Sequence, residues 1–188
     1  LCMAGAINHF PLIYSDTADY LGGAFGHYIP IDRPVFYGIF MRIVSLQTSL
    51  WLVIFVQGLL ISYLLFETFG IFYEGNKRNF LFILSVGILA VCTGLSENVS
   101  LLLPDIFTPI GLLCFVNLLL NNKLRPWQKV FMSFTLIFCM LFHFSNMLVM
   151  FSLLMLLWAY WLIRRLRKRT FPLHTNMLIL CSALTLSI

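Results

Sequence analysis

Charged residues alternate between the two ends of a series of long apolar segments, and this pattern leaves the chain few architectures. Three stretches, 73–79, 121–129 and 164–169, hold ten of the twelve Lys and Arg. Five of the acids lie between those stretches, at the other ends of the apolar segments: Asp16, Asp19, Asp32, Glu97 and Asp105. Proteins that cross a bilayer several times show this alternation, because Lys and Arg are retained in cytoplasmic loops. We therefore expect the acidic loops to share the non-cytoplasmic face.

The composition agrees with a membrane location. The chain is 61% hydrophobic, 10% charged and has a mean hydropathy of +0.94, whereas soluble domains carry about 25% charged residues. The net charge of +5 sits in short loops beside apolar segments, so orientation in the membrane explains it and nucleic acid is not expected as a partner. The five cysteines are scattered singly, which excludes a C-x-x-C metal or redox motif.

We expect an all-α, polytopic transmembrane helical bundle with an extracytoplasmic loop of juxtamembrane helices. The whole chain, 1–188, is interpreted as a single membrane domain and as a fragment of a longer protein. Its parts are the end of a truncated first span, an extracytoplasmic loop and the transmembrane helices: 1–13, 14–47 and 48–188. Within the last part, the full spans are expected near 48–69, 80–96 and 101–120, with another beginning near 174.

The segment 130–163 is too long for one span and short for two. A single span would place 164–169 on the face opposite the other basic clusters. Two helices that turn at 143–146 keep all three basic clusters together, so we predict a hairpin there.

The loop 14–47 is expected to contain two short helices. One covers about 16–27, with Ser15 or Asp16 as its N-cap. The other, about 34–47, mixes apolar and polar residues around Arg42, which is typical of a helix that lies at the membrane surface. At the end of the first full span, Glu67 is expected to extend toward the cytoplasmic interface.

Four polar elements should meet on the non-cytoplasmic face. They are the stretch 14–20, the stretch 32–34, the stretch 96–98 with Asp105, and the turn 143–146. A truncated first span, a loop of the form Y-S-D-x-x-x-Y-L, a following R-P-x-x-Y and a P-D that opens a later span resemble the type C membrane glycosyltransferases. The relatives in question are the protein O-mannosyltransferases and the lipid A aminoarabinose transferases.

This resemblance implies a sugar donor on a polyprenyl phosphate, an acceptor that is a glycan, lipid or protein, and inversion at the anomeric carbon. In that family the first extracytoplasmic loop carries a catalytic acid, and Asp16 matches it by position. The relatives often show a paired D-E there, whereas this chain has Asp16-Thr17. The departure leaves the assignment of the base open.

An inverting transfer needs a base for the proton of the acceptor and a group that stabilises the leaving phosphate. A carboxylate beside the low-dielectric membrane holds a proton more tightly than in water, which suits a base. Asp16 is the candidate base, and the alternative is that it only caps a helix. A guanidinium holds phosphate oxygens bidentately. Arg33 and Arg42 are the cations outside the basic stretches, and Arg42 is also explained as an interfacial anchor.

Substrate-binding roles are expected for five residues: Asp19, Arg33, Glu97, Asp105 and His143. Ionisable groups near membrane depth are costly and are often functional. Each also has a simpler explanation. Asp19, Glu97 and Asp105 are solvated boundary charges in that alternative. Arg33 then pairs with Asp32 or a lipid headgroup, and His143 is a loop residue.

No metal or cofactor is required by these patterns. A divalent metal held by His9, His27 and Asp16 is kept as an alternative, although the spacing fits no established set of ligands. Two other functions also stay open, a polytopic transporter or flippase and a non-catalytic membrane scaffold. The short loops favour a bacterial inner membrane, with the site on the periplasmic or extracellular face.

Overall fold

The computed structural model describes residues 1–26, 29 and 33–166, and in these ranges the chain is helical without named strands. The expected span near 174 and the residues His27 and Asp32 lie outside the described residues. The elements are α1 (Met3–Ile7), α2 (Thr17–Phe25), α3 (Phe36–Val44), α4 (Trp51–Phe72), α5 (Gly75–Cys92), α6 (Leu95–Ser100), the 3-10 turn η1 (Pro104–Ile106), α7 (Phe107–Leu120), α8 (Pro126–Phe142) and α9 (Phe144–Leu166).

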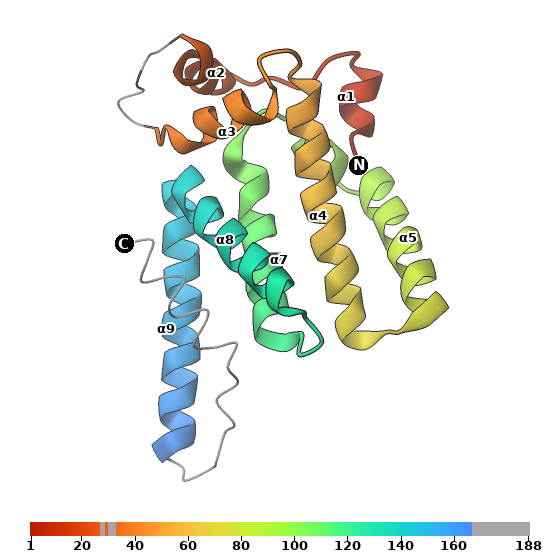
Figure 1. Cartoon of the computed structure of the whole chain (residues 1–188), viewed down its shortest axis with the longest axis vertical. Coiled ribbons are helices and arrows are strands. Elements are labelled where there is room, and N and C mark those ends of the chain that lie inside the picture. Colours follow the sequence, from red (N-terminus) through yellow and green to blue (C-terminus); the bar gives the residue numbers. More distant parts are fainter. Residues whose placement is uncertain (27–28, 30–32, 167–188) are drawn as a thin grey trace.

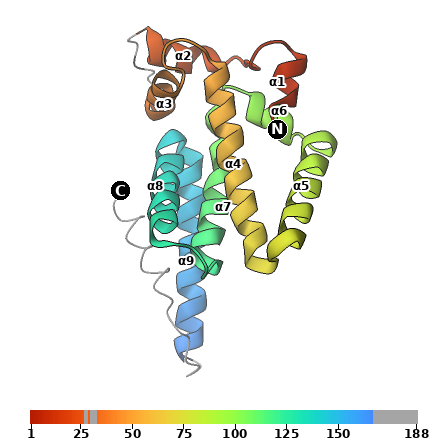
Figure 2. The same cartoon turned by 45° about the vertical axis from the view of Figure 1, so that its right-hand side comes forward.

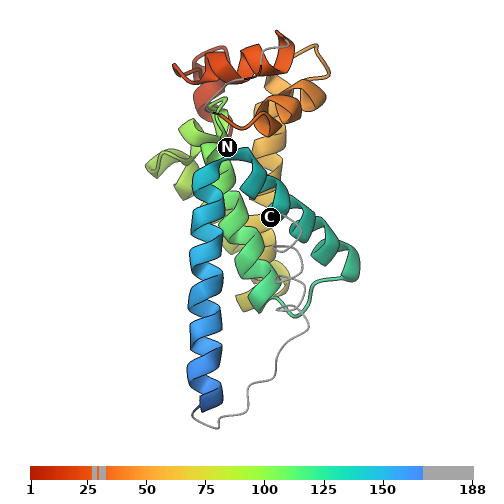
Figure 3. The same ribbon diagram turned by 90° about the vertical axis from the view of Figure 1, so that its left-hand side faces the viewer.

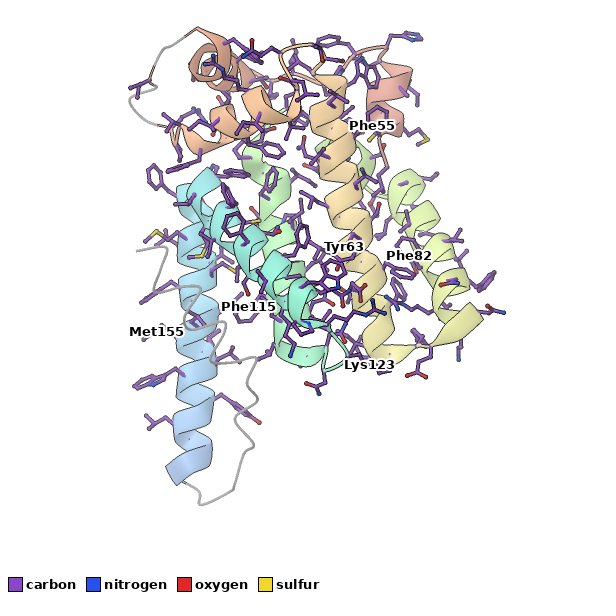
Figure 4. All side chains as sticks on the ribbon, viewed as in Figure 1. Phe55, Tyr63, Phe82, Phe115, Lys123 and Met155 are labelled. Carbon is purple, nitrogen blue, oxygen red and sulfur yellow. The ribbon has the colours of Figure 1, made fainter. Side chains whose placement is uncertain are left out.

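The long helices run up and down beside one another. Helix α4 descends in Figure 1, α5 returns upward, α7 descends, α8 rises and α9 descends. The α4–α5 and α7–α8 connections therefore lie at one end of the bundle, and the labelled Lys123 is found there (Figure 4). We call this the basic end, defined by Lys77, Arg78, Lys123 and Arg125. The opposite acidic end carries Asp16, Asp19, Glu97 and Asp105. These four acids thus lie opposite the basic loops, as the sequence predicts, although each end also carries charges of the other sign.

Three short helices cover the acidic end. Figure 3 shows α2 and α3 lying across the ends of the long helices, with α1 near them. Helix α1 packs against α6, and the backbone of Leu12 bridges to the segment around Leu101 by two hydrogen bonds. Helix α3 buries Tyr37, Gly38 and Met41 and leaves an apolar face uncovered. The two short helices expected in 14–47 are therefore present as α2 and α3.

Helix α7 is the centre of the packing. It contacts α4 on one side and α8 and α9 on the other, and buries Ile110, Cys114 and Leu118 among them. Gly111 allows the close approach, since a Cβ there would lie 2.9 Å from the terminal methyl of Met150. In lipid, such small residues let helices gain van der Waals contact where hydrophobic burial provides little driving force.

Two helices, α4 and α5, are long and apolar enough to cross a membrane. Length and composition also fit the core helix of a water-soluble protein, and the burial of the two helices differs. A third of the most apolar window of α4 is buried, and none of that of α5. No residue of α5 is buried, so its apolar side chains that face away from α4 have no protein core around them. The apolar helices Pro104–Leu120, Pro126–Phe142 and Phe144–Tyr160 are shorter than these two.

The helix boundaries differ from the expected ones where glycine and proline intervene. Gly75, at a φ of 57°, starts α5 several residues before position 80. The expected span 101–120 begins instead with η1, because the residue before Pro104 is extended and cannot continue a helix. The predicted hairpin in 130–163 is confirmed as two antiparallel helices, which are interrupted at the extended residue His143.

Candidate functional site

Asp16, Asp19 and Arg33 form one ion-paired cluster at the acidic end. An Oδ2 atom of Asp16 lies 3.0 Å from an Nη of Arg33, and Arg33 Nε lies 3.5 Å from an Oδ2 of Asp19. Asp16 occupies the N-cap position of α2, but its side chain makes no capping hydrogen bond. The capping alternative for Asp16 is therefore wrong, since its carboxylate faces the guanidinium. Asp19 is three residues further along and lies on the same side of α2, as the helical spacing predicts.

Two buried tyrosines lie beside this cluster. The guanidinium carbon of Arg33 is 5.7 Å from the ring centroid of Tyr20, and the edge-to-face rings of Tyr20 and Tyr37 are 5.2 Å apart. Burial raises the pKa of Tyr20, and the hydrogen bond and charge of Arg33 partly oppose the rise. Burial raises the pKa of Tyr37 well above its ordinary value. The hydroxyl of Tyr37 has no hydrogen-bond partner among the described residues. Neither tyrosine was assigned a role from the sequence, although Tyr20 falls in the Y-S-D-x-x-x-Y-L motif and Tyr37 ends the R-P-x-x-Y motif.

The tyrosines are positioned by close packing of α2 on α3 and by aromatic contacts below. A Cβ at Gly38 would lie 3.2 Å from the carbonyl oxygen of Tyr20, so only glycine allows this approach without displacing backbone. Tyr37 also contacts three rings from α3, α7 and α8: Phe40, Phe107 and Phe142. The site is therefore built on rigid elements, whose aromatic contacts stabilise the arrangement.

Asp105 and His143 are brought together from separate helices. Asp105 Oδ1 lies 3.9 Å from His143 Nε2, and both side chains are partly open to solvent. His143 Nδ1 accepts a hydrogen bond of 3.2 Å from the backbone N–H of Ser145. Since Nδ1 is an acceptor, the proton of the neutral ring is on Nε2, toward Asp105. The side chain of His143 thus caps α9 by accepting a hydrogen bond from a backbone N–H of its first turn. The pair lies near Tyr37, because the ring of Tyr37 contacts Phe107 and Phe142, which are close to Asp105 and His143 in the chain.

Glu97 is the expected site residue that the structure separates from the others. It lies on α6, which packs against α1, whereas α2 and α3 lie on the other side of α4 (Figure 2). Glu97 lines its own pocket with Asn8 and Asn98. Of the four polar elements expected to converge, those of Asp16, Arg33 and Asp105 with His143 come together. Arg42, the second candidate cation, is an exposed residue in the last turn of α3.

The candidate metal site gains no support from the described residues. Within 1–26, 29 and 33–166, no group of three His, Cys, Asp or Glu side chains could hold a metal ion. His9 adopts a φ of 58° in the turn after α1, and His27 lies outside the described residues. The side chains that the structure brings into contact at the acidic end are carboxylates, the guanidinium of Arg33, phenols and the imidazole of His143.

A second polar network, at the basic end, was not expected. Glu67 does not extend freely to the interface: its side chain is 14% exposed and pairs with Arg78 at 3.3 Å. Its other carboxylate oxygen accepts a hydrogen bond of 3.0 Å from Gln128 Nε2. The same nitrogen also donates to the hydroxyl of Tyr63. These side chains tie α4 to α5 and α8 (Figure 4). A Cβ at Gly70 would lie 2.9 Å from the guanidinium of Arg78, so glycine makes room for it.

Comparison with known proteins adds no assignment: no family model, no curated protein and no solved structure matches the chain. The chemistry must therefore be inferred from the cluster at the acidic end. Its carboxylates can accept protons, and the guanidinium of Arg33 can bind an oxyanion bidentately. These two abilities within one contact are what an acyl, phosphoryl or glycosyl transfer to a hydroxyl requires.

Proposed function

We propose that the chain is part of an integral membrane enzyme that transfers a sugar from a polyprenyl-phosphate donor to an acceptor on the non-cytoplasmic face. The observation that carries the proposal is the contact of Arg33 with Asp16 and Asp19. The contact places a candidate base beside a candidate phosphate-binding side chain at the acidic end of an apolar bundle. The resemblance to the type C membrane glycosyltransferases supplies the substrate class.

A multi-pass membrane location is part of the same proposal. Helix α5 has no buried residue, and large apolar side chains of α8 and α9 are exposed. In water, an apolar surface of this extent would favour aggregation. The charges at the two ends orient the basic end toward the cytoplasm. A bacterial inner membrane, with the cluster on its outer side, fits this orientation.

The proposed reaction uses each member of the cluster. The hydroxyl of the acceptor attacks the anomeric carbon of the sugar, and its proton passes to the carboxylate of Asp16. The bond from the anomeric carbon to the phosphate oxygen breaks, and the polyprenyl phosphate leaves with the bonding electrons. Arg33 holds that phosphate. Donor phosphate competes with Asp16 for the guanidinium, so donor binding would release the carboxylate for its role as base.

Asp105 and Asp19 remain substrate-binding candidates under this proposal. Asp105 lies at the start of the bundle beside the tyrosines, where it can orient a sugar hydroxyl. Asp19 balances the charge of Arg33 while Asp16 is engaged with the acceptor. His143 is better explained as a residue that caps α9, because Nδ1 is already occupied.

The transporter alternative is favoured by one observation, the Glu67–Arg78 pair. Ionisable pairs within transmembrane helices often mark transport pathways. This pair, however, lies near the end of α4 and at the start of α5, close to the basic loops. Transporter sites lie near the bilayer midplane, between broken helices. The position of the pair is better explained by a structural role.

The test compares strains that carry the full-length gene in its own host. Surface glycans and lipid-linked sugar pools are measured in wild type, a deletion strain, Asp16→Asn and Arg33→Ala at matched membrane expression. Glu74→Gln is the control, since Glu74 is an exposed acid at the basic end. The proposal predicts that deletion, Asp16→Asn and Arg33→Ala each remove one glycan and accumulate its donor.

Three other outcomes would change the conclusion. If the glycan is lost in the deletion strain and in Arg33→Ala but not in Asp16→Asn, the enzyme class stands and Asp16 is rejected as the base. Loss with the deletion alone would place the site away from the cluster. An unchanged glycan and carrier pool in the deletion strain would reject sugar transfer and favour a transporter or scaffold.

A further inference from the structure

The pocket around Glu97 is rich in hydrogen-bond acceptors. It has a volume of about 560 Å³ and is lined by α1, α6 and the segments that follow them. Asn98 Nδ2 donates to the carbonyl of Gly94 at 2.8 Å, and Asn8 Nδ2 donates to the carbonyl of Phe10 at 3.1 Å. Each of these bonds uses one N–H of the amide, so the amide oxygen and the second N–H remain for a ligand.

Glu97 adds a full negative charge to these acceptors. Its side chain is exposed, and none of the ion pairs formed by the described residues includes it. A pocket with one carboxylate and two amide oxygens suits a cationic group that brings several hydrogen-bond donors. A primary ammonium has three N–H donors and a positive charge. An anion would meet the carboxylate without a compensating cation and is disfavoured.

An apolar groove adjoins this pocket and shares Asn98 with it. The groove lies between α4, α5, α6 and α7 and has a volume of about 580 Å³. Its walls include Ile61, Leu65, Leu89 and Leu112. The two spaces together resemble the shape of an amphiphile, with a polar head at the acidic end and a tail along the helices.

We propose that the pocket and the groove together bind a membrane phospholipid whose head group ends in a primary ammonium. The ammonium lies at Glu97 and the amide oxygens of Asn8 and Asn98, and one hydrocarbon chain lies in the groove beside Leu89 and Leu112. The inference depends on the membrane location proposed above and not on sugar transfer. The site is on the opposite side of α4 from the Arg33 cluster (Figure 2), so the two can be occupied independently.

The test is a lipid titration of the purified protein in detergent, with bound lipid counted by native mass spectrometry. Phosphatidylethanolamine, phosphatidylcholine and phosphatidylglycerol with identical chains are the probes. Phosphatidylcholine keeps the positive charge but has no N–H donor. We expect phosphatidylethanolamine to bind about tenfold more tightly than either, since charge-assisted hydrogen bonds to a carboxylate are lost with both alternatives. Equal affinities for the three lipids would overturn the proposal.

Two variants test the head-group site and the groove for the hydrocarbon chain separately. Glu97→Gln replaces an exposed side chain and should not affect folding. It should remove most of the preference for phosphatidylethanolamine, while Glu74→Gln, the exposed acid at the basic end, should preserve it. Leu89→Trp fills the groove from the peripheral helix α5 and should weaken the binding of all three lipids alike. A preference that survives Glu97→Gln would refute the head-group site, and unchanged binding in Leu89→Trp would refute the groove.

These outcomes do not depend on the enzyme. If lipid binding behaves as expected while glycan transfer is unaffected by deletion, the binding site stands and the proposed function fails. If Asp16→Asn and Arg33→Ala abolish transfer while the three lipids bind equally, the proposed function stands and this inference fails.

Discussion

The unpartnered hydroxyl of Tyr37 makes a prediction whose sign is unusual for a buried residue. Tyr37 is 0% exposed, and its hydroxyl donates to no described group. Leaving a buried polar group without a partner costs about 1–3 kcal/mol. Tyr37→Phe removes that group and keeps the ring contacts with Tyr20 and Phe107. The small void left by one oxygen offsets part of the gain, so we expect a net stabilisation of about 1–2 kcal/mol.

The assay is thermal unfolding of the purified protein, followed by circular dichroism and by tryptophan fluorescence. For a chain of this size, 1 kcal/mol shifts Tm by about 2–4 °C. Tyr37→Phe should therefore raise Tm by about 2–8 °C under the same relation. A gain of this size is far outside the error of the measurement.

The chain supplies a matched control in Tyr63. Its hydroxyl accepts a hydrogen bond of 3.1 Å from Gln128, which is mostly buried. Tyr63→Phe makes the same chemical change but leaves a donor of Gln128 with one partner fewer, and it should lower stability by about 1 kcal/mol. The reasoning is refuted if both substitutions lower Tm, because the hydroxyl of Tyr37 would then have a partner that contributes to stability.

Three further predictions concern other parts of the fold. Glu67→Ala leaves Arg78 partly buried without its carboxylate and should cost about 2–4 kcal/mol in denaturant unfolding, whereas replacing both by Leu and Met should recover most of the loss. Gly38→Ala should cost about 1–3 kcal/mol in the same assay, because its Cβ presses on the backbone at Tyr20 and separates α2 from α3; an unchanged midpoint would contradict the packing. The raised pKa of Tyr37 means that the unfolded chain ionises first, so stability should fall above pH 10.0 by about 1.4 kcal/mol per pH unit for this group. Tyr37→Phe should make that fall shallower when unfolding is measured across the alkaline range, and equal slopes would show that Tyr37 does not contribute.

The helical class and the order of the helices were predictable from the sequence. Apolar runs of about twenty residues favour helices in lipid, because a helix satisfies its own backbone hydrogen bonds. The alternation of charge predicted which ends lie together, and it resolved 130–163 into the hairpin of α8 and α9. Spacing along α2 likewise placed Asp16 and Asp19 on one face, since residues three apart are neighbours on a helix.

The pairing of side chains could not be predicted, because it depends on which helix faces meet. The sequence offers the same apolar character on nearly every side of α4, so nothing in it marks the face on which Glu67 meets Arg78 and Gln128. Gly70 is what admits Arg78, and a lone glycine in an apolar run gives no indication of its neighbour. The expectation that Glu67 extends toward the cytoplasmic interface did not include this pairing for the same reason.

The candidate site, like the fold, was only partly predictable from the sequence. Residue type and chain order predicted that Asp16, Arg33, Glu97 and Asp105 belong to one end of the molecule, because the alternation of charge indicates which ends of the apolar segments lie together. Only the tertiary structure decided that α4 separates Glu97 from the other three, and that the phenol of Tyr37 lies buried and unpartnered beside them. Depth and direction within a helical layer arise from packing contacts between segments far apart in the chain, which a one-dimensional pattern does not encode.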